Sequence, residues 1–373
     1  MADGPDRPAP DEISEALHPA MTPFLAGHAE AEAALAAAAN AGSIHHAWLF
    51  TGPPGIGKAT LAYRFTRSLL AGPSGGGLFG APPAGLHGDP DDPLFAQVAQ
   101  ASHPNLLVLR RSWNFDTKRY ASEIRVDDVR RLAGFLGQRA SRRGRRVVLV
   151  DAADDLNRNA ANALLKPLEE PPADTVFILV AHAPGGLLPT IRSRCRRLVL
   201  RPLSAGDADS VVARQAPELD PSERAELLAL SDNAPGRALR LAAAGGTTLY
   251  RRLLETLSGL PAIDPGKAQA LGDMVADRSS GETAFALLTD MLDGLLKRLV
   301  RAGQGDTDTP PAEAELLARL GGVRLDQWFE VWDNLARLRE RTEAVNLNRK
   351  AVLLSLLSAF ETAAARTPGT ARR

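Results

Sequence analysis

Residues 52–58 have the types and the spacing of a phosphate-binding loop. They read GPPGIGK, which fits the pattern G-x-x-x-x-G-K. Glycines at Gly52, Gly55 and Gly57 allow backbone N–H groups to turn toward phosphate oxygens, and Lys58 would reach the outer phosphates. The positive end of a following helix would add to this attraction. The spacing predicts a nucleotide-binding fold; a glycine- and proline-rich turn without a ligand is the alternative.

The residues that should complete a magnesium site depart from the usual pattern. The position after the lysine normally carries a hydroxyl that binds Mg²⁺, but here it is Ala59, and Thr60 lies about 100° further round a helix. Asp151 follows an apolar run and could bind the metal, but the next residue is Ala152, where a second acid would orient the attacking water. We therefore expect no hydrolysis, at most weak binding of ATP or ADP with Mg²⁺, and no other metal site.

Alternating strands and helices are predicted to position these residues. Apolar runs favour strands at residues 45–51, 105–109, 147–150, 176–180 and 198–200. Helical periodicity favours helices at residues 22–40, 60–70, 94–101, 125–136 and 158–168. This alternation indicates an α/β fold with a parallel sheet and helices on both of its faces. After Pro202 only helices are predicted.

The chain is predicted to contain three folded parts. These are an α/β domain at residues 21–203, a small helical domain at 204–248 and a larger helical domain at 249–366. Residues 1–20 are rich in Asp, Glu and Pro and are predicted to be disordered, as are residues 367–373. The Gly/Pro-rich residues 72–92 are expected to form a surface insertion.

Composition excludes several classes of protein. The 373 residues include 44 Lys+Arg and 44 Asp+Glu, so the net charge of zero argues against binding nucleic acid or a membrane by bulk charge. The single Cys195 rules out an internal disulfide and a cysteine-cluster zinc site, and it indicates a reducing, cytoplasmic setting. No apolar run reaches the ~20 residues that span a bilayer, so no membrane partner is expected.

Three further motifs, taken together with the loop, resemble a known family. They are NALLKPLEEPP at residues 162–172, LPTIRSRC at 188–195 and APGRAL at 234–239. The combination resembles the clamp-loader branch of the AAA+ proteins, and within that branch it is similar to the delta-prime subunits of bacterial DNA polymerase III. The specific motifs cover about residues 20–245.

The resemblance implies an AAA+ P-loop domain, a helical lid and a helical collar for the three predicted parts. It implies a largely static subunit of a five-subunit assembly with delta-like and gamma/tau-like partners, which loads a sliding clamp onto primed DNA. Arg194 would act in trans as an arginine finger on a neighbour's ATP, and Arg237 would contact phosphates from the lid. Many relatives carry a four-cysteine zinc module that this chain lacks at residues 72–104, so no zinc is expected.

Several positions depart from the family pattern. Pro167 is expected to bend the helix at residues 158–168 or to end it early. Ala181 and His182 replace the residue that senses phosphate in relatives. Two other functions are therefore retained as alternatives: an active gamma/tau-like ATPase, and a nucleotide-binding interaction module outside replication. Without the family motif, Arg194 would be only an exposed basic residue, and Arg237 would only tie the lid to the first domain.

Other polar residues are predicted to be structural or solvated. Asp154 and Asp155 are expected to be solvated near a helix start, and His45 and His46 to pack at a strand entrance. Cys195 is expected to be a small apolar residue rather than a nucleophile. The arginines at residues 139–146 are expected to lie on a solvated loop rather than on DNA, because no aromatic residues are interleaved with them.

Overall fold

The fold was analysed in a computed structural model of the whole chain. It describes residues 18–40, 44–72, 85–86, 88–114, 119–137, 145–277, 281–302, 311–320, 325–345 and 347–365. Both predicted disordered ends therefore lie outside the described residues, apart from residues 18–20, as does most of the insertion at residues 72–92. Within the described ranges, no helix has the length and apolar character that a membrane span requires.

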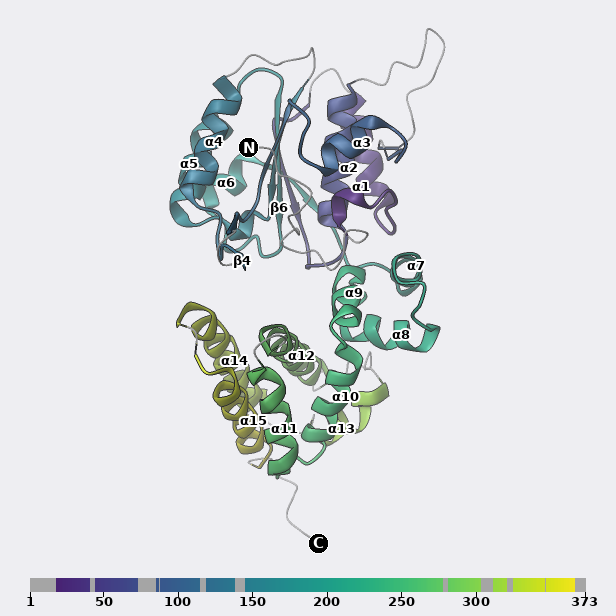
Figure 1. Cartoon of the computed structure of the whole chain (residues 1–373), viewed down its shortest axis with the longest axis vertical. Coiled ribbons are helices and arrows are strands. Elements are labelled where there is room, and N and C mark those ends of the chain that lie inside the picture. The colour runs from purple at the N-terminus through teal and green to yellow at the C-terminus, as the bar shows by residue number, and fades with distance from the viewer. Residues whose placement is uncertain are drawn as a thin grey trace. The chain divides into compact units, whose positions relative to one another are not determined.

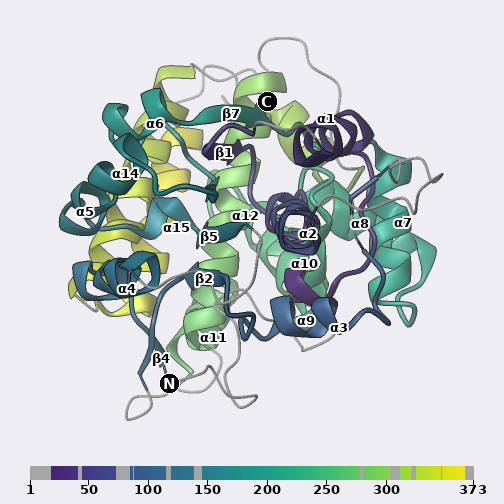
Figure 2. The same cartoon turned by 90° about the horizontal axis from the view of Figure 1, so that it is seen from above.

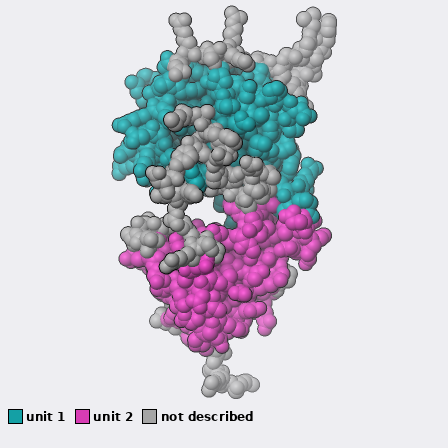
Figure 3. Space-filling model, in the orientation of Figure 1, with its two compact units in different colours: residues 1–217, 233–237 teal, residues 218–232, 238–373 magenta. Residues whose placement is uncertain are grey.

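The chain divides into two compact units, which Figure 3 distinguishes by colour. Unit 1 comprises residues 1–217 and 233–237, and unit 2 comprises residues 218–232 and 238–373. The short segment 233–237 therefore belongs to unit 1 although the chain on both sides of it belongs to unit 2. The predicted division into α/β, lid and collar domains stays a prediction.

A five-stranded parallel sheet forms the centre of unit 1, with the strand order β2-β5-β6-β1-β7. The strands are β1 (Ala47–Thr51), β2 (Leu106–Leu109), β5 (Arg146–Asp151), β6 (Thr175–Ala181) and β7 (Arg196–Val199). A separate antiparallel ribbon consists of β3 (Trp113–Asn114) and β4 (Arg119–Tyr120). The predicted α/β class with a parallel sheet is confirmed.

Helices cover both faces of this sheet (Figures 1 and 2). One face carries α1 (Ala29–Asn40), α2 (Lys58–Ala71) and α3 (Pro93–Ala99), and the other carries α4 (Val126–Gly137), α5 (Arg158–Glu169) and α6 (Pro189–Arg194). Short helices η2 (Pro19–Met21) and η3 (Ala153–Asp155) and the helix α7 (Ala205–Gln215) complete the unit. Because both faces are covered, every residue of β6 is buried, which explains its continuous apolar run.

The helix predicted at residues 22–40 is wrong in its first part, because α1 begins only at Ala29. Gly27 has a φ of 73°, in the left-handed region that a helix does not use. Further upstream, residues 19–21 form the short helix η2, although residues 1–20 were predicted to be disordered. The Ala20 N–H donates to Nδ1 of the His18 ring at 3.0 Å, which caps this helix. Pro167 lies inside α5, which ends two residues later at Glu169.

Unit 2 consists of helices. They are α8 (Pro221–Leu230), α9 (Pro235–Ala243, whose first residues belong to unit 1), α10 (Gly246–Leu257), α11 (Pro265–Ala276), α12 (Gly281–Ala302), η4 (Pro311–Glu313), α13 (Ala314–Leu320), α14 (Leu325–Val345) and α15 (Arg349–Ala365). A buried polar cluster joins three of them. The Tyr250 hydroxyl donates to Glu313 Oε1 at 2.7 Å, and Arg298 Nε donates to Glu313 Oε2 at 2.6 Å.

Candidate functional site

The predicted phosphate-binding loop joins the end of β1 to the start of α2, so its sequence context is as predicted. Lys58 is the first residue of α2, and its side chain is buried, with 3% exposed. Its ammonium donates to the loop carbonyls of Gly52, at 2.7 Å, and Pro53, at 2.5 Å. The Lys58 ammonium has three N–H donors. Two of them bond to carbonyls of the loop itself rather than to a phosphate.

The loop also contacts the segment of α9 that belongs to unit 1. The Gly236 N–H donates to the carbonyl of Gly55 at 2.9 Å. Gly55 has a φ of 82°, and a Cβ at this position would lie 2.7 Å from the backbone nitrogen of Arg237. Glycine is required at residue 55 for both reasons. Arg237 therefore lies against the loop, and its predicted contact with phosphates stays a prediction.

The other predicted nucleotide-site residues lie at the same edge of the sheet. Asp151 ends β5, and Thr51 ends β1, with the end of β6 between them. Parallel strands that end together at a change in strand order form the usual binding crevice of such sheets. Thr60 is the third residue of α2 and is half-buried. Ala152, where an acid was expected in an ATPase, is buried and contributes no polar side-chain atom.

Asp154 is wrongly predicted to be a solvated residue. Its carboxylate accepts the backbone N–H groups of His182 and Ala183, the latter at 2.9 Å. It therefore fastens the loop after β5 to the loop after β6, which begins at His182. Asp155 is also paired, with Arg111 at 3.1 Å. No local pattern distinguishes these two acids from solvated ones, because their partners are distant in the sequence.

Arg194 is the last residue of α6, which lies on the face of the sheet opposite α2 (Figure 1). It lies just before the start of β7, whereas the phosphate loop follows the end of the neighbouring parallel strand β1. Its side chain is 31% exposed and forms an ion pair with Glu169 at the end of α5. Nη1 of Arg194 also donates to the carbonyl of Thr190 at 2.8 Å. The predicted site residues thus form two groups: the loop group with Asp151 and Arg237, and Arg194 by itself.

Cys195 is half-buried and packs against the apolar core beneath α5 and α6. Burial raises the pKa of its thiol to about 11. A thiol with this pKa is protonated at neutral pH, and the protonated form is a poor nucleophile. This environment agrees with the prediction that Cys195 is a packing residue.

We expect Cys195 to react slowly with iodoacetamide in the folded chain. At pH 8 a pKa near 11 leaves about 0.1% thiolate, compared with about 10–25% for an unperturbed cysteine, so alkylation should be on the order of 100-fold slower than in urea. Cys195 is the single cysteine of the chain, so mass spectrometry of the alkylated fraction measures this rate directly. Equal rates in the native and the urea-unfolded chain would contradict the assignment.

The remaining predicted residues have structural partners or lie outside the described residues. The rings of His45 and His46 stack with centroids 4.7 Å apart, and His46 Nε2 lies 3.0 Å from the Leu168 carbonyl. Of the arginines at residues 139–146, only Arg145 and Arg146 are described, and both bond to backbone carbonyls. His28, which sequence reasoning missed, lies 2.7 Å from the Ile56 carbonyl of the phosphate loop.

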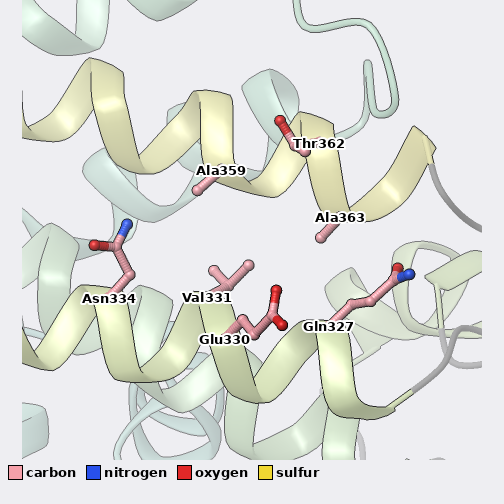
Figure 4. A pocket seen from close by; sticks show the side chains of 7 residues that line it. All are labelled: Gln327, Glu330, Val331, Asn334, Ala359, Thr362 and Ala363. Carbon is pink, nitrogen blue, oxygen red and sulfur yellow. The ribbon is translucent and has the colours of Figure 1, made fainter.

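A pocket in unit 2 lies between α14 and α15 (Figure 4). Glu330 and Asn334 of α14 and Thr362 of α15 are among the residues that line it. All residues that line this pocket belong to unit 2, whereas the phosphate loop belongs to unit 1. Within the described ranges, no group of three or more His, Cys, Asp or Glu side chains is arranged to hold a metal ion.

The parallel sheet, with a G-x-x-x-x-G-K loop between β1 and α2, defines a P-loop protein of the AAA+ class. A family model described as "DNA polymerase III, delta subunit" matches residues 27–204. DNA polymerase III subunit delta' of Escherichia coli is 31% identical over 331 residues, which are 88% of this chain and 92% of that protein. The chain belongs to the delta-prime family of DNA polymerase III subunits, which confirms the predicted class of clamp-loader subunit.

The chain is also similar to other DNA polymerase III subunits and to a solved structure. Subunit delta' of Pseudomonas aeruginosa is 41% identical over 197 residues, which are 52% of this chain and about half, 55%, of that protein. Subunit tau of Salmonella typhimurium is 29% identical, over 69% of this chain and 38% of that protein. A solved structure of a DNA polymerase III gamma subunit-related protein from Thermotoga maritima is 19% identical, with a TM-score of 0.37, and the match covers 86% of this chain and 95% of that one.

Proposed function

We propose that this chain is the non-hydrolysing subunit of a cytoplasmic clamp loader and gives Arg194 to the ATP bound by a neighbouring subunit. Its partners in this proposal are delta-like and gamma/tau-like subunits in a pentamer that places a sliding clamp on primed DNA. The observation that carries the proposal is the contrast between its two groups of site residues. In the loop that would bind its own nucleotide, Lys58 bonds to loop carbonyls, whereas Arg194 is partly exposed at the opposite end of the strands.

The chemistry of phosphoryl transfer supports a role in trans for Arg194. In the transition state, negative charge spreads over the oxygens of the γ-phosphate, and an arginine from outside the site can stabilise it. Arg194 precedes the start of β7, and the chain's own phosphate loop follows the end of the parallel strand β1. The two therefore lie at opposite ends of these strands, which supports a partner site on another subunit. Docking would then be required for hydrolysis, because the arginine arrives only with its subunit.

The state of the phosphate loop supports the absence of hydrolysis. A bound nucleotide would have to replace the bonds from Lys58 to the carbonyls of Gly52 and Pro53. It would also lack the Mg²⁺-binding hydroxyl at Ala59 and the water-orienting acid at Ala152. An active gamma/tau-like ATPase is therefore the less favoured alternative, and family membership disfavours a module outside replication.

The collar role of residues 249–366 is part of the same proposal. Phe329 of α14 is 51% exposed, and its ring stacks on Trp332 with centroids 5.9 Å apart. Trp332 is half-buried, and in this proposal the exposed ring of Phe329 belongs to a surface that another subunit covers. Co-purification of the full chain, with mass identification of its partners, tests whether delta-like and gamma/tau-like subunits associate with it.

We expect the isolated chain to hydrolyse no ATP. We also expect no saturable binding of a fluorescent ATP analogue at concentrations below about 1 mM. A Kd of about 1 mM corresponds to a binding free energy of only about 4 kcal/mol. The reason is the loss of both metal-site side chains together with the internal bonds of Lys58. Lys58→Ala provides the matched variant, because it removes the one cation of the loop. A steady ATPase rate in the wild-type chain that Lys58→Ala abolishes would show that the chain is an active ATPase.

A further inference from the structure

Arg194 is held by a partner from a different helix of its own chain. Its guanidinium pairs with the carboxylate of Glu169, which lies 25 residues earlier in the sequence, at the end of α5. The same guanidinium donates through Nη1 to the Thr190 carbonyl at 2.8 Å and to the Ser193 hydroxyl at 3.4 Å. These contacts fix the direction of a long side chain that is otherwise free to rotate.

Rigid elements support both ends of this ion pair. α5 begins at a capped end, where the Asn157 side chain accepts the Ala160 N–H at 2.9 Å, and its apolar side is buried through Leu164 and Leu168. α6 is held on the same face of the sheet by the buried Ile191. Because both helices pack on one core, the carboxylate of Glu169 has a defined position relative to the base of Arg194.

The ion pair leaves part of the guanidinium available. Arginine has five N–H donors, and the bonds to Glu169, Thr190 and Ser193 use three of them, which leaves two. The side chains of Arg194 and Glu169 are 31% and 47% exposed, so an incoming phosphate can approach. Two N–H donors suffice for bidentate binding of a phosphate. The remaining donors, Nε–H and one N–H of Nη2, are the ones that a phosphate would use in the proposal.

The ion pair is too exposed to matter much for folding. Exposed ion pairs contribute little to stability, and salt screens them further. The pair does restrict the Arg194 side chain to few rotamers. An arginine that becomes fixed at an interface loses side-chain entropy. If Glu169 restricts Arg194 before the subunits dock, less of this entropy is lost during docking.

We propose that Glu169 is the positioning residue for Arg194: it orients the guanidinium toward the neighbour's nucleotide before the subunits dock. The proposal rests on the role of Arg194 described above. The opposite role is also physically conceivable, in which Glu169 restrains Arg194 and must release it. The two roles predict opposite signs, because removal of a positioning residue slows hydrolysis and removal of a restraint accelerates it.

The test compares Glu169→Ala with Glu170→Ala in the assembled complex. Glu170 is the next residue, is exposed, and caps α5 through its backbone N–H to the Lys166 carbonyl at 3.0 Å, which alanine retains. The ATPase subunits of the complex are prepared so that one nucleotide site, the one proposed to receive Arg194, stays active. The other sites are inactivated by substitution of the lysine in their own phosphate loops. We expect Glu169→Ala to lower kcat at this site on the order of tenfold with KM unchanged, and Glu170→Ala to have no effect.

Two further variants separate positioning from a general structural effect. Glu169→Gln keeps an oxygen that accepts from the guanidinium, so it should recover part of the rate. The double variant Glu169→Ala with Arg194→Ala should be no slower than Arg194→Ala alone, because Glu169 acts only through Arg194. An additive loss in the double variant would show that Glu169 acts by another route and would overturn the proposal.

The remaining outcomes distinguish this proposal from the function on which it rests. If Arg194→Ala slows hydrolysis but Glu169→Ala behaves like Glu170→Ala, the positioning role is wrong and the arginine finger stands. A faster rate in Glu169→Ala would overturn the positioning role in favour of restraint. If Arg194→Ala leaves the rate unchanged in an assembled complex, both the finger and the role of Glu169 are wrong.

Discussion

A complex that contains Arg194→Ala is expected to assemble normally and to lose about 10³-fold or more of the ATP hydrolysis at the site that Arg194 faces. The physical reason is that an arginine finger stabilises charge that develops only in the transition state. The total rate of the complex would fall only in part, because its other sites keep their own arginines. The rate is therefore measured with those other sites silenced, together with the rate of clamp loading.

Arg192→Ala is the matched control for this experiment. Arg192 lies on the same helix, α6, and its side chain is exposed, so its removal changes the local charge by the same amount. Arg197 is a poorer control, because its Nε donates to the Thr51 hydroxyl at 3.2 Å, at the end of the strand that leads into the phosphate loop. Normal clamp loading by an assembled Arg194→Ala complex would reduce Arg194 to a surface charge.

Arg298→Met is expected to lower the free energy of unfolding of unit 2 by about 3–5 kcal/mol. Arg298 and Glu313 are 6% and 0% exposed, and the substitution would leave the Glu313 carboxylate buried without its cation. Burial and the charge of Glu313 raise the pKa of Tyr250, so the tyrosine stays a neutral donor and cannot replace that charge. Urea unfolding, followed by hydrogen exchange in α12 and α15, measures the change in this unit.

A graded set of variants tests whether the buried charge is the cause. Tyr250→Phe removes one neutral hydrogen bond to Glu313 and should cost only about 1–2 kcal/mol. Arg298→Met combined with Glu313→Gln removes both charges, so it should recover a large part of the loss. If Arg298→Met has the same free energy of unfolding as the wild-type chain, the buried charge is not the cause. Glu313 would then be protonated or hydrated in the variant at little cost in free energy.

The order of the elements could be predicted from the sequence, because it depends on local patterns. The runs that became β1, β5 and β6 are continuously apolar, and such runs mark strands that helices cover on both faces. The start of α1 was mispredicted because the predicted helix was extended back over residues 22–28, which include Pro23 and Gly27. Gly27 takes a left-handed φ there, which periodicity alone does not reveal.

The pairings within the site could not be predicted in the same way. Lys58 was expected to bind phosphate, and only the folded loop brings its ammonium to the carbonyls of Gly52 and Pro53. Asp154 was expected to be solvated, and only the adjacency of β5 and β6 brings its carboxylate to the N–H groups after β6. Each of these pairings depends on the orientation of a side chain, which composition and spacing do not encode.

The fold class, the family and the replaced residues of the nucleotide site could all be inferred from residue types and their spacing. Ala59 and Ala152 are visible without a structure, because the absence of a hydroxyl or an acid is a property of residue type. The contacts of Gly55 with Gly236 and of Arg194 with Glu169 became known from the folded chain alone. Such contacts join segments far apart in the chain, and their distances follow from the packing of whole helices on the sheet.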